Sequence, residues 1–465
     1  MVAANRAIGD LRRRDPLADP RVRVALNDAR SALLLTDRRY DAIVSQPSHP
    51  WTAGSAQLYT VEFLELVKRR LAAGGVFVQW MGLSFVDREL FETILATLGR
   101  VFPHVRAYRP LPSEVLFVAS DRPLAVEPQV SRVLAKARAE LAAVGIAGPE
   151  DAAAALLLDS ESAALLAEGA RPNTDDANRL AMRSPHILGQ ALGSAGADRI
   201  LARRDPLLDA DGALDRIAVV QRLLARDERG RAERIAAATR DPIARETALG
   251  YVALARGDRA GALDAFGRVL SRDPSALQAR AGLVRLRRQA LLAGEPSAEA
   301  LAAGLDAGGA SVVEGWRAEG ARDWAALETL DLRLAALAPQ HPLYAQALRL
   351  RATWRLESGA PEQARVALEL LDELLEREGS AEDLVLRARA AARAGHPSIA
   401  LVDLADVAAA LEQSRSAGSP QAIRRTARDA LGALRELPED PAQRSARAQL
   451  ERRLRALVAS RPQRM

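Results

Sequence analysis

Polar side chains that could do chemistry follow two predicted strands near the N-terminus. Asp28 comes after the alternating, β-branched run Arg21–Leu26, and Gln46 and His49 lie in the loop after Tyr40–Ser45. An imidazole titrates near neutral pH, so His49 could serve as a general base. The amide of Gln46 takes no proton in that range. Asp28 could bind a ligand, or it could equally cap the helix that follows it.

Two aromatic residues and an acidic pair are further candidates for a site. Trp51 and Tyr59 could line a pocket beside the loop, and core packing is the alternative use of each. Asp175 and Asp176 have no His or third carboxylate beside them in the sequence, so a helix cap or surface turn explains them better than a metal. We therefore predict no metal site. Cysteine is absent, which excludes disulfides, thiolate zinc sites and thiol catalysis.

The elements that must position these groups alternate between strand and helix as far as residue 119. Thr60 and Asp87 each precede an amphipathic run and predict helix caps. The glycine pair Gly74-Gly75 is typical of a helix end. Such alternation predicts a mostly parallel α/β sheet. The strands are expected at 21–26, 40–45, 76–80, 101–108 and 115–119, and the first helix at 29–35.

The aromatic residues divide the chain into two parts. Eleven of the seventeen lie between Tyr40 and Phe117, and the 348 residues after Phe117 hold the other six. From about Val130 the sequence is rich in Ala, Leu, Arg and Glu, and strand signals disappear. We therefore expect an α/β fold followed by an all-α fold, with domains at 1–190 and 191–465.

An internal repeat runs through the helical part. A Gly is followed five residues later by a small Ala and nine residues later by a large apolar residue, which predicts a tight turn between two closely packed helices. This spacing resembles the tetratricopeptide repeat. The copies are Gly257/Ala262/Phe266 with Pro274, Gly359/Ala364/Leu368 and Gly395/Ala400/Leu404, and a weaker copy has Ala326/Leu330, with Gly320 one residue early and Pro339 one residue late.

Residues 18–120 resemble the polyamine aminopropyltransferase (spermidine synthase) family. The resemblance rests on DPRVRVALNDARSALL at 19–34, YDAIVSQPSHPW at 40–51 and AQLYTVEFLELVKRRLAAGGVFVQW at 56–80. NTDDANRLAMRSP at 173–185 resembles a segment of the bacterial branch in which this domain follows a membrane-embedded region. The resemblance implies a Rossmann-like sheet of the methyltransferase type, with strand order 3-2-1-4-5-7-6. It also implies a role in polyamine biosynthesis, in which the aminopropyl group of decarboxylated S-adenosylmethionine moves to an amine.

The same resemblance implies roles for the candidate residues and shows where this chain departs from the family. Gln46 and His49 match the family's acidic, catalytic positions, and Asp28 matches an Asp that binds the adenine amino group. A glycine-rich cofactor loop and a ribose-binding acid are not found, and Met1–Arg6 looks like the stretch after that acid. We therefore expect an N-terminally truncated family member with impaired catalysis, in which the strand at 21–26 corresponds to strand 3. Decarboxylated S-adenosylmethionine is implied as a substrate only, and no bound cofactor is predicted.

Charge and hydropathy restrict the partners. The chain has 65 Lys and Arg against 60 Asp and Glu, interspersed throughout, so no nucleic-acid partner is predicted. No apolar run is long enough to span a bilayer. We expect a cytoplasmic protein, or one held at a membrane through a partner or a missing upstream segment. The helical repeats predict a peptide or protein ligand, and the oligomeric state stays open.

Overall fold

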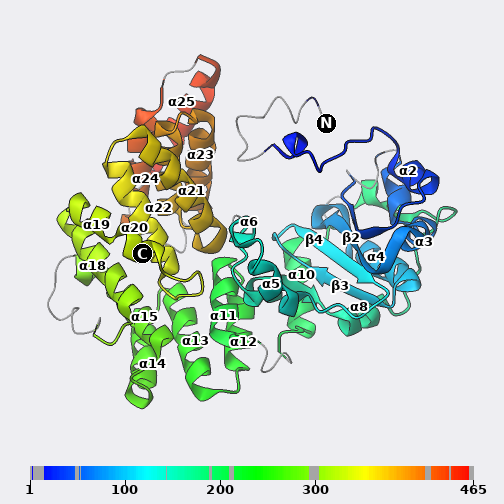
Figure 1. Ribbon diagram of the computed structural model, residues 1–465, viewed down its shortest axis with the longest axis horizontal. Coiled ribbons are helices and arrows are strands. Elements are labelled where there is room, and N and C mark those ends of the chain that lie inside the picture. The colour runs from blue at the N-terminus through cyan, green and yellow to red at the C-terminus, as the bar shows by residue number, and fades with distance from the viewer. Residues whose placement is uncertain are drawn as a thin grey trace.

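The computed structural model describes residues 15–47, 54–142, 144–187, 191–208, 214–292, 303–413, 420–438 and 441–459, with the single residues 3 and 52. The sheet and the helices beside it lie at one end of the molecule, and an array of helical hairpins forms the other end (Figure 1). The predicted order of an α/β part followed by an all-α part is confirmed. The predicted boundary at residue 190 stays a prediction.

A five-stranded sheet forms the N-terminal part, in the order β1-β2-β4-β3-β5. Only β1 and β2 run parallel, whereas the β2–β4, β4–β3 and β3–β5 pairs are antiparallel. The prediction of a mostly parallel sheet was therefore wrong, because β4 returns directly beside β2. The first four strands keep the expected order 4-5-7-6 of the family sheet. The strands are β1 (Tyr40–Ser45), β2 (Leu71–Gly82), β3 (His104–Tyr108), β4 (Glu114–Ser120) and β5 (Leu156–Leu158).

One face of this sheet carries the core. Along β2 the buried residues alternate with half-buried ones, as a strand with one packed face requires. Phe77 and Met81 on that face are fully buried, and Phe117 of β4 lies in the same cluster. Helices α3 (Val61–Arg70), α4 (Arg88–Val101) and α8 (Ser160–Ala167) contribute the opposite side of the core.

The predicted helix caps are confirmed. Thr60 accepts a hydrogen bond from the N–H of Phe63 at the start of α3, and Asp87 accepts one from Leu90 at the start of α4. Each cap satisfies one of the N–H groups that the first turn of a helix leaves unpaired. These caps orient the apolar faces of both helices toward the sheet.

The glycine pair Gly74-Gly75 does not end a helix. Helix α3 ends at Arg70, and β2 begins at Leu71. Gly74 has a φ of 74°, and the β1–β2 register shifts between Tyr40 and Ala42 beside this pair. The pair therefore forms an irregularity within the strand, where a positive φ favours glycine.

The run Arg21–Leu26 is not a strand, which corrects a second prediction. It is irregular, and Val22, Val24 and Leu26 are 45%, 54% and 89% exposed. Alternation produces a strand only when a neighbouring strand pairs with the backbone. In the described part of the chain β1 pairs only with β2, so this run has no ladder to join.

Most of the other described residues are helical. The shorter ones near the sheet are α2 (Ala29–Leu35), α5 (Val126–Leu134), α6 (Arg138–Ala142), α7 (Pro149–Ala155), α9 (Arg179–Arg183) and α10 (Gly193–Arg203). The array contains α11 (Arg216–Ala225), α12 (Arg229–Ala237), α13 (Pro242–Ala255), α14 (Arg259–Arg272), α15 (Leu277–Leu286), α16 (Arg288–Leu292), α18 (Ala307–Ala321), α19 (Trp324–Ala335), α20 (Tyr344–Glu357), α21 (Pro361–Glu378), α22 (Ala381–Arg393), α23 (Pro397–Gln413), α24 (Pro420–Glu436) and α25 (Arg444–Ala459).

Five hairpins of this array share one turn. In each, a residue with positive φ stands two positions before the second helix begins, which reverses the chain in a few residues. Glycine fills this position in the three repeat copies identified from the sequence. Arg322 fills it in the weaker copy, and Gly320 instead lets the backbone approach the Leu292 carbonyl. The five residues are Asp227, Gly257, Arg322, Gly359 and Gly395.

Among the described helices, none combines the length and the apolar character that crossing a bilayer requires.

Candidate functional site

The carboxyl end of β1 lies beside β2, and the loop predicted to carry the site follows it. Ser45 of β1 pairs with Gln79 of β2. The Gln79 amide is buried and donates to the carbonyl oxygens of Ser45 at 3.4 Å and Trp80 at 3.3 Å. Its Oε1 atom is buried and has no hydrogen-bond partner among the described residues. Gln46 follows Ser45 directly and is exposed.

The chemistry of this edge is that of amides and hydroxyls. Gln46 presents an amide at the carboxyl end of β1, where a general base would need a group that accepts a proton. An amide donates and accepts hydrogen bonds but does not titrate near neutral pH. His49 and Trp51, the other residues predicted in this loop, lie outside the described residues. Their roles stay predictions.

Tyr59 lies beneath this edge, in the core. The residue is 3% exposed, and its hydroxyl donates to the Trp80 carbonyl oxygen at 3.1 Å. Burial raises the pKa of Tyr59, and the nearby Gln79 side chain opposes that shift. The hydroxyl thus joins the end of β2 to the segment before α3. That Tyr59 lines a substrate pocket stays a prediction.

Asp28 caps helix α2. Its Oδ1 atom accepts the N–H of Ser31 at 2.8 Å, and this bond lowers the pKa of the carboxyl group. The side chain is exposed, so a second partner could still approach it. The sequence left capping and adenine binding open. The structure shows the cap, and adenine binding stays a prediction.

Asp175 holds the late segment against the start of α3. It accepts two hydrogen bonds from Arg30, at 2.9 and 2.5 Å, and one from the Thr60 hydroxyl at 2.8 Å. Its own N–H donates to Glu62 at 2.9 Å. The interpretation of Asp175 as a surface turn or cap therefore missed its main contact, an ion pair with α2. Within the described ranges no three His, Asp or Glu side chains gather as a metal site requires.

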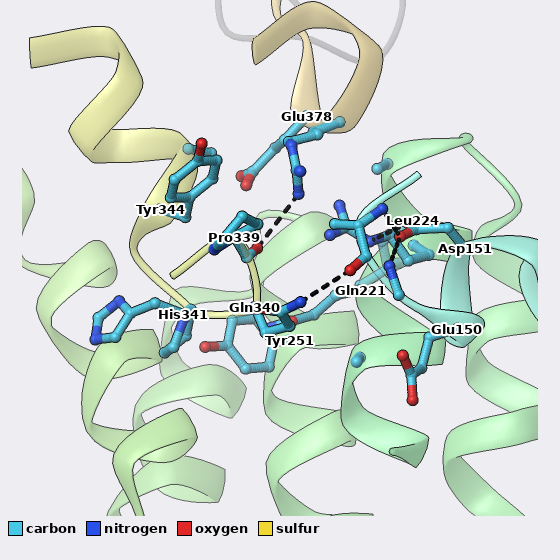
Figure 2. Close-up of a pocket in the computed structure, with 18 of the residues that line it drawn as sticks. Glu150, Asp151, Gln221, Leu224, Tyr251, Pro339, Gln340, His341, Tyr344 and Glu378 are labelled. Atoms are coloured by element: carbon cyan, nitrogen blue, oxygen red, sulfur yellow. Dashed lines mark hydrogen bonds and ion pairs between the residues drawn. The ribbon is translucent and has the colours of Figure 1, made fainter. Parts of the chain in front are cut away.

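A cavity in the helical array was missed by the sequence analysis. It has a volume of about 630 Å³ and lies between α7, α11, α13, α20, α21 and the loop Pro339–Pro342 (Figure 2). Its lining comes from residues as far apart as Ala147 and Ser380. No local sequence motif indicates such a site, because the lining residues come together only when the hairpins pack.

Comparison with known proteins finds a similarity to one family in the N-terminal part of the chain, which contains the sheet. Residues 4–113 match the model of the spermine/spermidine synthase domain. The polyamine aminopropyltransferase 2 of Aquifex aeolicus is 34% identical over 82 residues, which cover 18% of this chain and 17% of that protein. The polyamine aminopropyltransferase of a Synechococcus strain is 39% identical over 93 residues, covering 20% of this chain and 30% of that protein.

Two further matches cover more of the chain at lower identity. The polyamine aminopropyltransferase of Korarchaeum cryptofilum is 26% identical over 164 residues, which cover 34% of this chain and 51% of that protein. The crystal structure of a probable spermidine synthase from Corynebacterium glutamicum is 21% identical and covers 37% of this chain and 61% of that chain, with a TM-score of 0.26. The chain spans about half or less of these three curated relatives. Its N-terminal region thus matches a spermine/spermidine synthase domain and has polyamine aminopropyltransferase homologues over a short segment.

Proposed function

We propose that the sheet part is a spermidine synthase-like domain in which aminopropyl transfer is impaired. The observation that carries this proposal is the exposed amide of Gln46 at the carboxyl end of β1. In the family that residues 4–113 match, this position is implied to hold the acid that takes a proton from the attacking amine. An amide neither accepts that proton nor neutralises a cationic diamine.

A charge-restoring substitution tests this proposal. Purified full-length protein and the Gln46→Glu variant are incubated with decarboxylated S-adenosylmethionine and putrescine, and spermidine is measured by mass spectrometry. General-base catalysis contributes roughly 100-fold to 10,000-fold, so wild type should be slower than a competent enzyme by such a factor. Gln129→Glu on α5 is the matched control. Gln129 is exposed, and its substitution adds the same charge away from this edge. Wild-type turnover equal to that of an ordinary enzyme would overturn the proposal.

We further propose that the helical array binds a polypeptide partner in the manner of tetratricopeptide-like repeats. The shared turn of the five hairpins supports this function, because regularly stacked hairpins present an extended surface. Each of the second helices α14, α19, α21 and α23 also carries an exposed apolar residue. These are Leu263, Leu332, Val366 and Val402. A cytoplasmic location is part of the same proposal.

Co-purification tests the partner proposal. Tagged protein is isolated from its host beside a Leu332→Glu, Val402→Glu variant, since these residues are 83% and 60% exposed and their replacement should disturb little packing. The proposal expects a specific protein that wild type retains and the variant loses. If wild type retains no specific protein, the interaction function is wrong.

A further inference from the structure

The cavity of the helical array, here named the Arg377 cavity, has the size of a small-molecule site. Its volume is about 630 Å³, within the range of pockets that hold small organic ligands. Leu224 and Leu254 contribute apolar lining, and Tyr251 and Tyr344 contribute aromatic rings. Figure 2 shows Tyr251, Tyr344 and Gln340 placed around the same space, on different helices and on the loop before α20.

Most arginines of the lining are already paired with carboxylates. Arg222 contacts Asp151 at 2.6 Å, and Asp151 also accepts the N–H groups of residues 147 and 148. Arg349 makes two hydrogen bonds to Asp383, at 2.6 and 2.7 Å. Arg285 bonds to Glu378. These cations are satisfied within the protein and need no ligand.

Arg377 has an ion-pair partner but few hydrogen bonds. Its side chain is 2% exposed, and among the described residues its one hydrogen bond is donated by Nη1 to the Pro339 carbonyl oxygen at 3.3 Å. Nε and Nη2 are buried without a hydrogen-bond partner among the described residues. Glu373 Oε1 lies 3.4 Å from Nε and forms an ion pair with Arg377 without a hydrogen bond, and the same oxygen accepts the Tyr344 hydroxyl at 2.9 Å.

The unused atoms form the donor pair that oxyanions prefer. Nε and Nη2 lie on one edge of the planar guanidinium, and such an edge binds a carboxylate or phosphate through two parallel hydrogen bonds. The Tyr344 ring lies under the guanidinium, with its centre 4.9 Å from Cζ, and holds the plane in place. Burial and the nearby Arg222 cation lower the pKa of Arg377.

Among the described lining residues, the buried side-chain atoms without a good hydrogen bond are all donors. They are Nε and Nη2 of Arg377 and the amide nitrogen Nε2 of Gln221, which lies beside the Tyr251 hydroxyl. An unpaired buried donor is unfavourable, and a ligand rich in acceptors would remove that penalty. A cation or a neutral apolar ligand would leave these donors unpaired. The cavity therefore favours an anion with several oxygens.

We propose that the Arg377 cavity binds a small organic acid, with its carboxylate or phosphate oxygens on Nε and Nη2 of Arg377 and its carbon skeleton against Leu224 and Leu254. This inference goes beyond the proposed domain function and does not depend on aminopropyl transfer or on a polypeptide partner. A carboxylate and a phosphate both fit this donor pair, so the ligand could carry either group.

Thermal unfolding and calorimetry on the full-length protein test the proposal. The probes are succinate, citrate, inorganic phosphate and glycerol phosphate, with succinamide as the neutral counterpart of succinate, all at constant ionic strength. A bound ligand raises the melting temperature by an amount that grows with the logarithm of its concentration relative to its Kd. We expect a shift with at least one acid and none with succinamide. The acid that produces the shift tells carboxylate from phosphate.

Variants then assign the binding to Arg377. Arg377→Met should weaken the binding of the responding acid by roughly tenfold or more, because two hydrogen bonds to a charged group are lost. Because the variant also loses the bond to the Pro339 carbonyl and the contact with the Tyr344 ring, its affinity is measured by calorimetry below its own melting temperature. Arg333→Met is the control, because Arg333 is 57% exposed and does not line the cavity.

Two results would overturn the proposal. One is the absence of a shift with every acid probe, and the other is equal affinity in wild type and Arg377→Met. Should Arg377→Met fail to fold, Arg377→Lys decides, because it keeps the charge and loses the two-donor edge. Unchanged affinity in Arg377→Lys would then contradict the assignment, and a loss of roughly tenfold would support it.

Discussion

Arg231 and Asp205 form a buried ion pair that joins the helical array to the sheet. Nε lies 2.7 Å from Oδ2 and Nη2 lies 3.0 Å from Oδ1, and the two side chains are 4% and 0% exposed. The same guanidinium donates to the carbonyl oxygens of Ala154 at 2.9 Å and Leu156 at 2.7 Å. Because Leu156 begins β5, one arginine of α12 connects the first hairpin of the array to the edge of the sheet.

Breaking this pair should destabilise the protein strongly. Asp205→Asn removes the closest counter-charge of a buried guanidinium and leaves Glu228, 3.3 Å from Nη1, as the remaining one, so the loss should approach the roughly 3–5 kcal/mol typical of breaking a buried pair. We expect that loss in urea unfolding followed by circular dichroism. The control is Arg204→Ala, since Arg204 pairs with Glu161 at the surface and such pairs contribute at most about 1 kcal/mol. Similar losses in both variants would contradict the importance of burial here.

The ion pair between Arg30 and Asp175 should make stability depend on pH. Arg30 lowers the pKa of Asp175 below the model-peptide value of 3.8. The stabilisation is therefore complete above pH 3.8 and is lost as the pH falls through the lowered pKa. Because both side chains are partly exposed, Asp175→Asn should cost on the order of 1 kcal/mol or less near neutral pH.

Unfolding curves from pH 7 down to pH 2 check this prediction. The difference between wild type and Asp175→Asn should close at the acidic end, where the wild-type carboxyl group is protonated. Arg30→Gln should remove most of the same difference in a double-mutant cycle. A gap that stays constant over the whole range would show that the carboxylate charge is not what stabilises this contact.

The weak repeat copy contains a turn that can be improved. Arg322 has a φ of 55°, a conformation that costs a non-glycine residue roughly 1–2 kcal/mol. Arg322→Gly should raise the free energy of unfolding by about 0.5–1 kcal/mol, since glycine loses part of this gain through backbone entropy. Arg322→Ala, which removes the side chain and keeps the strain, should change stability by about 0.5 kcal/mol or less.

The regular turns should respond in the opposite direction. Gly257 has a φ of 77° at the equivalent position, so Gly257→Ala should lower the free energy of unfolding by about 1 kcal/mol. Thermal or urea unfolding of the three variants provides the comparison. If Arg322→Gly is destabilising, the hairpins do not share the turn described above.

Local signals predicted the elements that local interactions form. Helix α2 and strand β1 begin and end where the sequence analysis placed them, and the caps of α3 and α4 are the residues named from their position and type. The predictions that were wrong or missing concern segments whose structure depends on a neighbouring strand. Arg21–Leu26 alternates but has no strand beside it, and β5 is three leucines within an alanine-rich run that the partner β3 recruits.

The candidate site was predictable only in part. The position of Gln46 after β1 followed from the strand signal, and its missing proton acceptor is a property of the residue type. The contacts of Asp175 were not predictable, because Arg30 is 145 positions away in the chain. The Arg377 cavity lay beyond sequence analysis for the same reason.

The most direct test of the central claim is the rate of aminopropyl transfer by the wild-type full-length protein. Spermidine formed from putrescine and saturating decarboxylated S-adenosylmethionine is quantified against a reaction without protein. Impaired catalysis predicts a rate at least about 100-fold below the median enzyme turnover of roughly 10 per second. A turnover near that median would show that Gln46 does not prevent the reaction and would contradict the account.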